Sequence, residues 1–113
     1  MLDSTAVHTR AGHRSTNKAQ TANAWKAAGR ILGLPFRNRT LFPAFQFDAD
    51  GQPHPLMKAV LAALPEDMTP WQRAFWLVAP DVQLDGEVPH ELVRQGDDRV
   101  VAAARDAGRL PIG

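Results

Sequence analysis

The sequence predicts a mainly α protein of the α+β class, with a helix and a β-hairpin in its first half and several helices in its second. In the second half, apolar residues recur at helical spacing. Prolines and capping residues there mark where helices begin. In the first half, residues 31–47 read as two apolar arms around a polar turn, which is typical of a hairpin. The 113 residues suffice for one ordinary domain.

The chain is expected to open with a polar tail and an Ala-rich helix. Residues 1–16 lack periodicity and are expected to form a flexible N-terminal tail. The helix is expected over residues 18–28, with Gly29 as its stop. Its N-cap would be one of three residues: Ser15, Thr16 or Asn17.

A hairpin is expected next, with arms at residues 31–36 and 41–47. Pro35 and Pro43 limit these arms to short or edge strands, because proline cannot donate a ladder hydrogen bond. Alternation about Gln46 would bury Phe45 and Phe47 on one face.

Four helices are expected in the second half, after a turn at residues 48–51. Their ranges are 56–64, 70–78, 89–93 and 99–107. Thr69 is expected to cap the second helix ahead of Pro70, and Asp97 or Asp98 to cap the last. Most of a group of six large apolar residues in these helices and their loops are assigned to the core, with one tryptophan expected to be exposed: Trp71, Phe75, Trp76, Leu84, Leu92 and Val100.

Composition narrows the functional classes. The chain has no cysteine, which excludes disulfides and thiolate metal sites. It has neither a signal-peptide pattern nor an apolar run long enough to span a bilayer, so a cytoplasmic protein without membrane contact is expected. Residues 1–50 carry seven basic side chains against three acidic ones, and residues 51–113 carry six against nine. The basic front and acidic rear indicate two partner surfaces, with chance as the alternative.

No set of residues has the spacing of a catalytic, metal or cofactor site. The four histidines are scattered, and no two fall on one helical face. Residues 48–51 resemble the start of a calcium loop, but Ala59 stands where the bidentate Glu belongs. Serine occurs only at Ser4 and Ser15, in the expected tail. We therefore expect a protein that is not an enzyme, with no cofactor.

The basic front has the outline of a nucleic-acid-binding helix and wing. Its candidate phosphate contacts are Lys26, Arg30, Arg37 and Arg39. The helix itself is mostly Ala and offers few side chains that can read base edges. A small DNA-binding regulator is the alternative function, and a solvated basic hairpin is the alternative without function.

Two stretches resemble the toxin-binding antitoxins of the Xre/MbcA/ParS type, with the ParS-like branch as the nearest. The first runs from Trp25 to Leu34 and continues over residues 41–53. The second runs from Trp71 to Ala104 and holds, in order, Trp-x-x-x-x-Trp-Leu, Leu-x-Gly-x-x-Pro-x-x-Leu and Val-x-x-Ala-Ala. Together they cover about residues 22–107. Members usually carry a fuller helix-turn-helix region before the first stretch, where this chain has only a polar segment.

The resemblance implies three segments and a partner. Residues 1–16 would be the tail, 17–55 a truncated winged-helix-like helix and hairpin, and 56–113 a helical toxin-binding domain. The partner would be a cognate RES-domain toxin, an ADP-ribosyltransferase or another NAD-consuming enzyme, whose NAD cleft the antitoxin occludes. Homodimers and toxin–antitoxin hetero-oligomers are also implied. A structural adaptor with the same helices and no toxin remains an alternative.

The residues expected to contact the toxin lie at the C-terminus and on one helix. A short basic and apolar tail follows Gly108, and its arginines can pair with acidic groups while its apolar side chains fill a pocket. Helical periodicity sets Trp76 to the side of Trp71 and Phe75, so Trp76 is expected as the exposed anchor. The candidate contact residues are Arg105, Arg109, Leu110, Pro111, Ile112 and Trp76. For the tail, the alternative is a frayed terminus.

Overall fold

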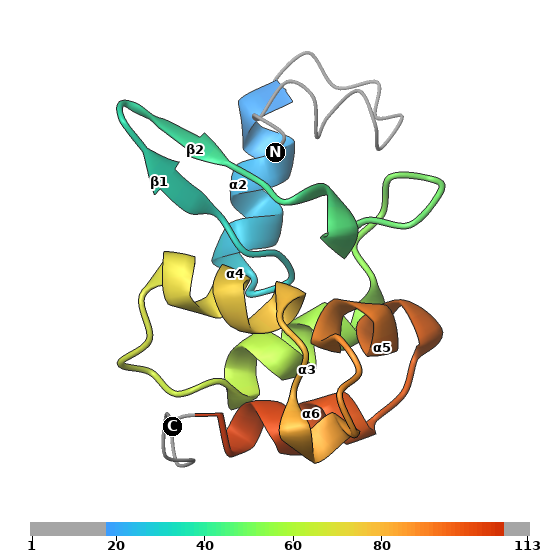
Figure 1. The fold of residues 1–113 in the computed structure, drawn as a ribbon. Helices are drawn as coiled ribbons and strands as arrows, with labels where there is room; N and C mark the ends of the chain where they lie inside the picture. The colour runs from blue at the N-terminus through green and yellow to red at the C-terminus, as the bar shows by residue number, and fades with distance from the viewer. Residues whose placement is uncertain (1–17, 108–113) are drawn as a thin grey trace.

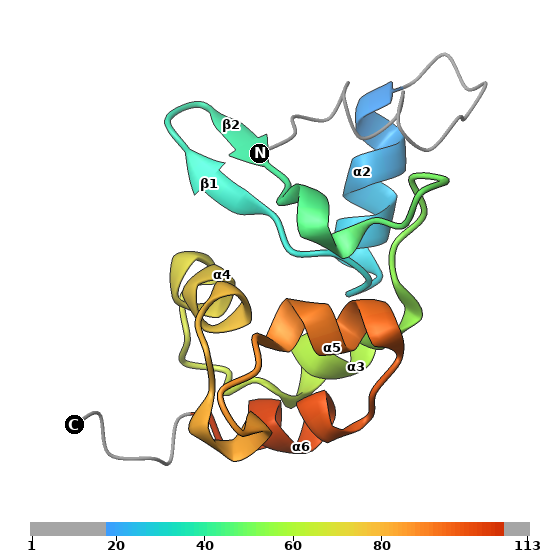
Figure 2. The same ribbon diagram turned by 45° about the vertical axis from the view of Figure 1, so that its right-hand side comes forward.

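The computed structural model describes residues 18–107, which form a mainly α fold with one small hairpin (Figure 1). The expected fold class is confirmed. α2, the two strands and the 3-10 helix η1 form one half of the molecule, and α3, α5 and α6 form the other (Figure 2). α4 lies next to the hairpin in both views.

The front half begins with α2 (Lys18–Ala27), which is close to the predicted range. Gly29 takes a left-handed φ of 74° directly after it, as a glycine stop requires. The three residues proposed as its N-cap lie outside the described residues. β1 (Leu34–Phe36) pairs antiparallel with β2 (Arg39–Leu41), so a hairpin with short strands is confirmed.

The second arm of the expected hairpin is wrong beyond Leu41. The chain forms η1 (Ala44–Gln46) there instead of a strand, directly after Pro43. Phe47 enters a front cluster with Trp25, whereas Phe45 packs against the main core. The two rings therefore do not share a face, because a 3-10 turn does not alternate its side chains as a strand does.

Gln46 is fully buried and joins the two halves. Its side-chain amide accepts a hydrogen bond from Leu32 N at 2.7 Å and donates one to Leu32 O at 2.9 Å. Leu32 belongs to the main core, while Phe47, next to Gln46, belongs to the front cluster. The amide thus satisfies a stretch of backbone that has no strand partner.

Local signals fix where the second-half helices start. α3 (Pro55–Ala63), α4 (Pro70–Val78) and α5 (Pro89–Gln95) each begin with a proline at the first helical position. Thr69 and Gln72 form a reciprocal capping box at the start of α4, and the predicted Thr69 cap is confirmed. The loop before α5 contains the 3-10 helix η2 (Val82–Leu84).

Asp98 occupies the N-cap position of α6 (Arg99–Arg105), but the side chain that bonds to the first turn is that of Asp97. The Asp97 carboxylate accepts a hydrogen bond from Arg99 N at 3.0 Å, whereas Asp98 makes no side-chain cap bond. Hydrogen bonds from the Arg99 side chain and backbone lower the pKa of Asp97. The carboxylate therefore stays charged at the positive end of the helix, where a negative charge is favourable.

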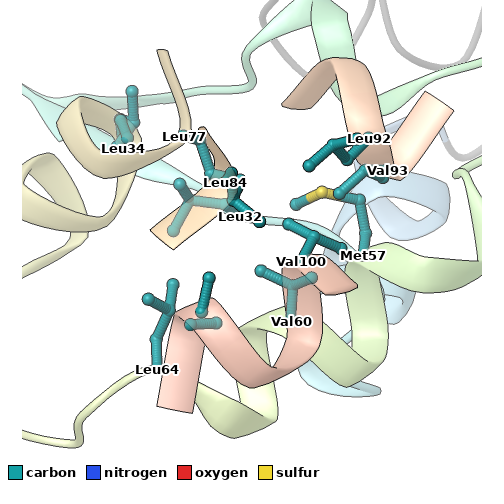
Figure 3. Packing of buried hydrophobic residues seen from close by; sticks show 13 residues of the cluster. Leu32, Leu34, Met57, Val60, Leu64, Leu77, Leu84, Leu92, Val93 and Val100 are labelled. Carbon is teal, nitrogen blue, oxygen red and sulfur yellow. The ribbon is translucent and has the colours of Figure 1, made fainter. Parts of the chain in front are cut away.

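One hydrophobic core includes residues from both halves of the chain (Figure 3). Leu32 and Leu34 of the first half pack with Leu77 of α4 and with buried side chains of α3, α5 and α6. The expected core residues Leu84, Leu92 and Val100 are confirmed as buried. A smaller front cluster holds Ala22, Trp25, Ile31, Phe42 and Phe47.

Candidate functional site

The outer face of α4 carries three of the five large hydrophobic side chains that are exposed in the described part of the chain. Trp71, Phe75 and Val78 lie on it at helical spacing and are 39%, 72% and 47% exposed. Leu77, on the far side of the same helix, and Ala74, which flanks these three residues, are buried in the core. α4 is thus apolar on both faces, which differs from an ordinary surface helix with one polar face. We call the residues Trp71, Phe75 and Val78 the α4 stripe.

A shallow apolar pocket lies along the α4 stripe. It has a volume of about 150 Å³ and is lined by the three stripe residues together with Ala74 and Phe45. Phe45 comes from η1, so the departure from the expected strand is what brings this ring to α4. His90 of α5 stacks on Phe45, with ring centroids 4.8 Å apart and planes 19° apart. The stack fixes one wall of the pocket.

Trp71 ties the stripe to the hairpin. Its indole Nε1 donates a hydrogen bond to Pro35 O of β1 at 2.9 Å. The indole is therefore held in one orientation while part of its ring stays exposed. A fixed aromatic side chain loses little conformational entropy when a partner covers it, which suits a binding anchor.

The hairpin tip adds a further aromatic ring and two arginines. Phe36 is 45% exposed, and the Arg37 guanidinium lies over its ring at 5.4 Å from the centroid. The backbone of Arg37 adopts a left-handed φ of 56°, which is uncommon for residues other than glycine. Arg39 pairs opposite Phe36 and is exposed.

The assignment of the α4 aromatics from sequence is wrong in orientation. Trp71 and Phe75, expected in the core, are exposed, whereas Trp76, expected as the exposed anchor, is half-buried and packs against the core. The Trp76 indole donates to the Asp81 carboxylate at 3.0 Å. Periodicity placed the three rings correctly relative to one another. It did not show which side of the helix faces the core, because both sides are apolar.

The predicted C-terminal contact residues fall partly inside the described chain. Arg105 is exposed at the end of α6, beside a hollow that it lines with Glu66 and Asp67. Arg109, Leu110, Pro111 and Ile112 lie outside the described residues.

The four predicted phosphate contacts do not share one environment. Arg37 lies in the hairpin turn and Arg39 begins β2 directly after it, whereas the Arg30 guanidinium covers the Trp25 ring at 5.8 Å from its centroid. Lys26 lines an open cleft of about 530 Å³ together with Lys58 of α3. The exposed residues of α2 from position 21 onward are Asn23, Ala24, Lys26 and Ala27, which give one amide and one ammonium group.

Groups for chemistry are sparse in the described part of the chain. Among residues 18–107, no three or more His, Cys, Asp or Glu side chains gather as metal ligands. Every buried side-chain polar atom there has a hydrogen-bond partner. No helix within this range is long and apolar enough to cross a membrane. The apolar α4 stripe and the hairpin tip are the features that remain to be explained.

No protein-family model, no curated protein and no solved structure matches this chain.

Proposed function

We propose that this chain is an antitoxin that binds a RES-domain toxin and neutralises it by covering its NAD cleft. The observation that carries the proposal is the α4 stripe, an aromatic face that the chain's own fold leaves uncovered. Exposed apolar patches of this kind mark protein-binding surfaces, and tryptophan is among the anchors that interfaces favour. The class of partner comes from the resemblance of the ordered motifs between Trp71 and Ala104.

Neutralisation would combine a docked body with a blocking tail. The α4 stripe would bind the toxin surface, and the segment after α6 would then lie close to it. Docking of the body raises the local concentration of Arg109, Leu110, Pro111 and Ile112 at the cleft, so a short tail can block a site for which it has little affinity alone. The chain would act by binding, without catalysis and without a cofactor.

The test is co-expression with RES-domain toxins, starting with any encoded beside this chain, with growth and co-purification as readouts. We expect the intact chain to restore growth and co-purify. A chain cut after Ala107 should co-purify without restoring growth. Phe75→Glu should lose both, because it places a charge in the middle of the stripe. Ala102→Glu, on the exposed side of α6, is the matched control and should behave as the intact chain.

The outcomes separate the parts of the proposal. If the cut chain restores growth, the antitoxin proposal stands but the blocking role of the tail is wrong. If the Phe75→Glu variant still co-purifies with the toxin, the α4 stripe is not the contact surface. If the intact chain co-purifies with no RES-domain toxin, the antitoxin proposal is wrong.

A DNA-binding regulator is the second candidate, because Arg37 and Arg39 stand together at an exposed hairpin tip. If this candidate is right, the chain should bind duplex DNA with an affinity that falls steeply as salt is added, and the Arg37→Ser/Arg39→Ser variant should not bind. The few base-reading side chains on the described part of α2 favour the first candidate.

A further inference from the structure

We infer that the α4 stripe and the hairpin tip form one continuous docking surface for a protein segment that carries a large apolar side chain flanked by carboxylates. The apolar side chain would enter the pocket lined by Phe45 and the stripe, and the carboxylates would meet Arg37 and Arg39. This inference rests on the proposal that the chain acts by binding a protein, and it adds the chemistry of the partner's segment.

The register of the hairpin places Phe36 and Arg39 on the same face of the hairpin as Leu34. Side chains alternate along a strand, so Leu34 and Phe36 share one face of β1. Arg39 lies directly opposite Phe36 and therefore shares that face. Leu34 packs in the core with Ala74 and Leu77 of α4, which shows that this face of the hairpin is turned to α4. Phe36 thus extends the apolar surface from Trp71, to which its strand is bonded through Pro35 O.

The pocket has the size of a single side chain. Its volume of about 150 Å³ is similar to that of apolar cavities that hold one benzene ring. Its lining is aromatic and aliphatic throughout, formed by Phe45, Trp71, Ala74, Phe75 and Val78. A Leu or Phe side chain of a partner fits this description, whereas a charged group would lose its hydration there without a partner.

The charges at the hairpin tip are of one sign and have no acidic partner within the described chain. Arg73, Arg94 and Arg99 are all held by carbonyl or carboxylate acceptors. In contrast, neither Arg37 nor Arg39 has an acidic partner among residues 18–107. No acidic residue lines the pocket. The surface is therefore complementary to carboxylates placed next to an apolar side chain.

The backbone at Arg37 indicates that its side chain has a use. A left-handed φ of 56° favours glycine or asparagine at this turn, and an arginine adopts it at a cost in stability. Its guanidinium covers an exposed ring rather than a buried group, so the side chain adds little to the fold. Strained residues of this kind cluster at binding sites.

The same charges argue against two other occupants. A second copy of this chain that docked through the same surface would bring another pair of arginines and an uncharged α4 stripe, with no carboxylate from that surface to meet Arg37 and Arg39. A nucleic acid would find phosphate contacts at the hairpin tip and none along Phe75 and Val78. The combination of arginines and apolar stripe fits an acidic, apolar protein segment better than either.

The test uses the full chain and three labelled synthetic peptides with a common Leu-Phe centre, flanked by Glu, by Lys or by Ser. Fluorescence anisotropy at low salt should show the Glu-flanked peptide binding at least tenfold more tightly than the Lys-flanked one. Added salt should reduce this difference, because exposed charge pairs are screened. Arg37→Gly/Arg39→Ser should weaken the Glu-flanked peptide about fivefold to tenfold and leave the Ser-flanked peptide unchanged.

Controls keep the test independent of folding. Arg37→Gly relieves the left-handed backbone, so the double variant should keep the circular dichroism spectrum of the parent. Phe75→Glu should abolish binding of all three peptides, and Ala102→Glu should change none of them. Equal affinity for the Glu- and Lys-flanked peptides would overturn the role of the arginines. Binding that survives Phe75→Glu would overturn the docking surface.

Failure of the inference and failure of the proposed function give different results. If a RES-domain toxin co-purifies equally with the parent and with Phe75→Glu, the antitoxin proposal stands and the inferred docking surface is wrong. A Glu-flanked peptide that binds the α4 stripe while no RES-domain toxin co-purifies would support the surface and overturn the antitoxin.

Discussion

At the scale of single residues, Gln46 shows how one polar side chain organises a core. Its amide replaces the strand partner that Leu32 lacks, by accepting from Leu32 N and donating to Leu32 O. Both backbone groups are buried, so each would lose its only protein partner without the amide. The bond spans 14 positions of sequence, and it also holds η1, which carries Phe45 to the pocket.

We predict that Gln46→Met lowers the free energy of unfolding by about 2–4 kcal/mol, because two buried backbone groups are left unsatisfied while side-chain volume is nearly kept. Urea denaturation followed by circular dichroism measures this loss. Gln83→Met, at an exposed position of η2, is the control and should change the free energy by less than about 0.5 kcal/mol. A change at Gln46 as small as that of the control would contradict the prediction.

At the scale of elements, α4 is held from its first turn. The Thr69–Gln72 capping box satisfies its first backbone donors. Arg73 then fixes the loop that leads into it, by donating to Leu61 O, Pro65 O and Met68 O at 3.1 Å, 3.1 Å and 3.3 Å. One guanidinium thus joins the last turn of α3 to the start of α4. The orientation of the α4 stripe depends on this loop.

Arg73→Lys should destabilise the protein by about 1.5–3 kcal/mol, because an ammonium group cannot reproduce the planar fork that reaches three carbonyls. Thermal and urea unfolding measure the loss, and hydrogen exchange should be faster at the start of α4. Arg94→Lys is the matched control, since Arg94 forms an exposed ion pair with Glu91 within one helix and should cost under about 1 kcal/mol. Equal effects of the two substitutions would show that the three carbonyl bonds add nothing.

At the scale of the whole molecule, two clusters of buried side chains behave as parts of one unit. The Gln46–Leu32 bonds link the segment that enters the front cluster at Phe47 to Leu32 of the main core, and the Phe45–His90 stack joins η1 to α5. Trp71 adds a third bridge, between α4 and the hairpin. With these connections, neither cluster can lose its packing without exposing part of the other.

We predict a single cooperative unfolding transition for the described region. In a Trp71→Phe/Trp76→Phe background, Trp25 is the one remaining tryptophan of the chain and reports on the front cluster. Its fluorescence transition should coincide with the helical circular dichroism transition. Leu92→Ala in the main core should lower both midpoints together and cost about 2–5 kcal/mol. A fluorescence transition that precedes the circular dichroism transition would show that the front unfolds alone.

Local signals in the sequence predicted most elements of this fold. Proline at the first helical position, the Thr69 cap and glycine at helix ends act within one turn of chain, so they can be read without knowledge of tertiary contacts. The hairpin follows for the same reason, apart from its second arm. Phe45 and Phe47 alternate as in a strand, yet they pack in different clusters, because Phe45 contacts the main core and Phe47 the front cluster.

Local and periodic signals in the chain are enough to predict the class of fold, the order of its elements and the spacing of apolar residues along each helix. Which side of α4 faces solvent depends on contacts between segments that are remote in sequence. Both sides of this helix are apolar, and the free energy of burial is proportional to area and has no direction. Contacts with Leu34 and the remote helices selected Ala74 and Leu77 for the core. Trp71 and Phe75 are therefore exposed, and they form the candidate site on the surface of α4.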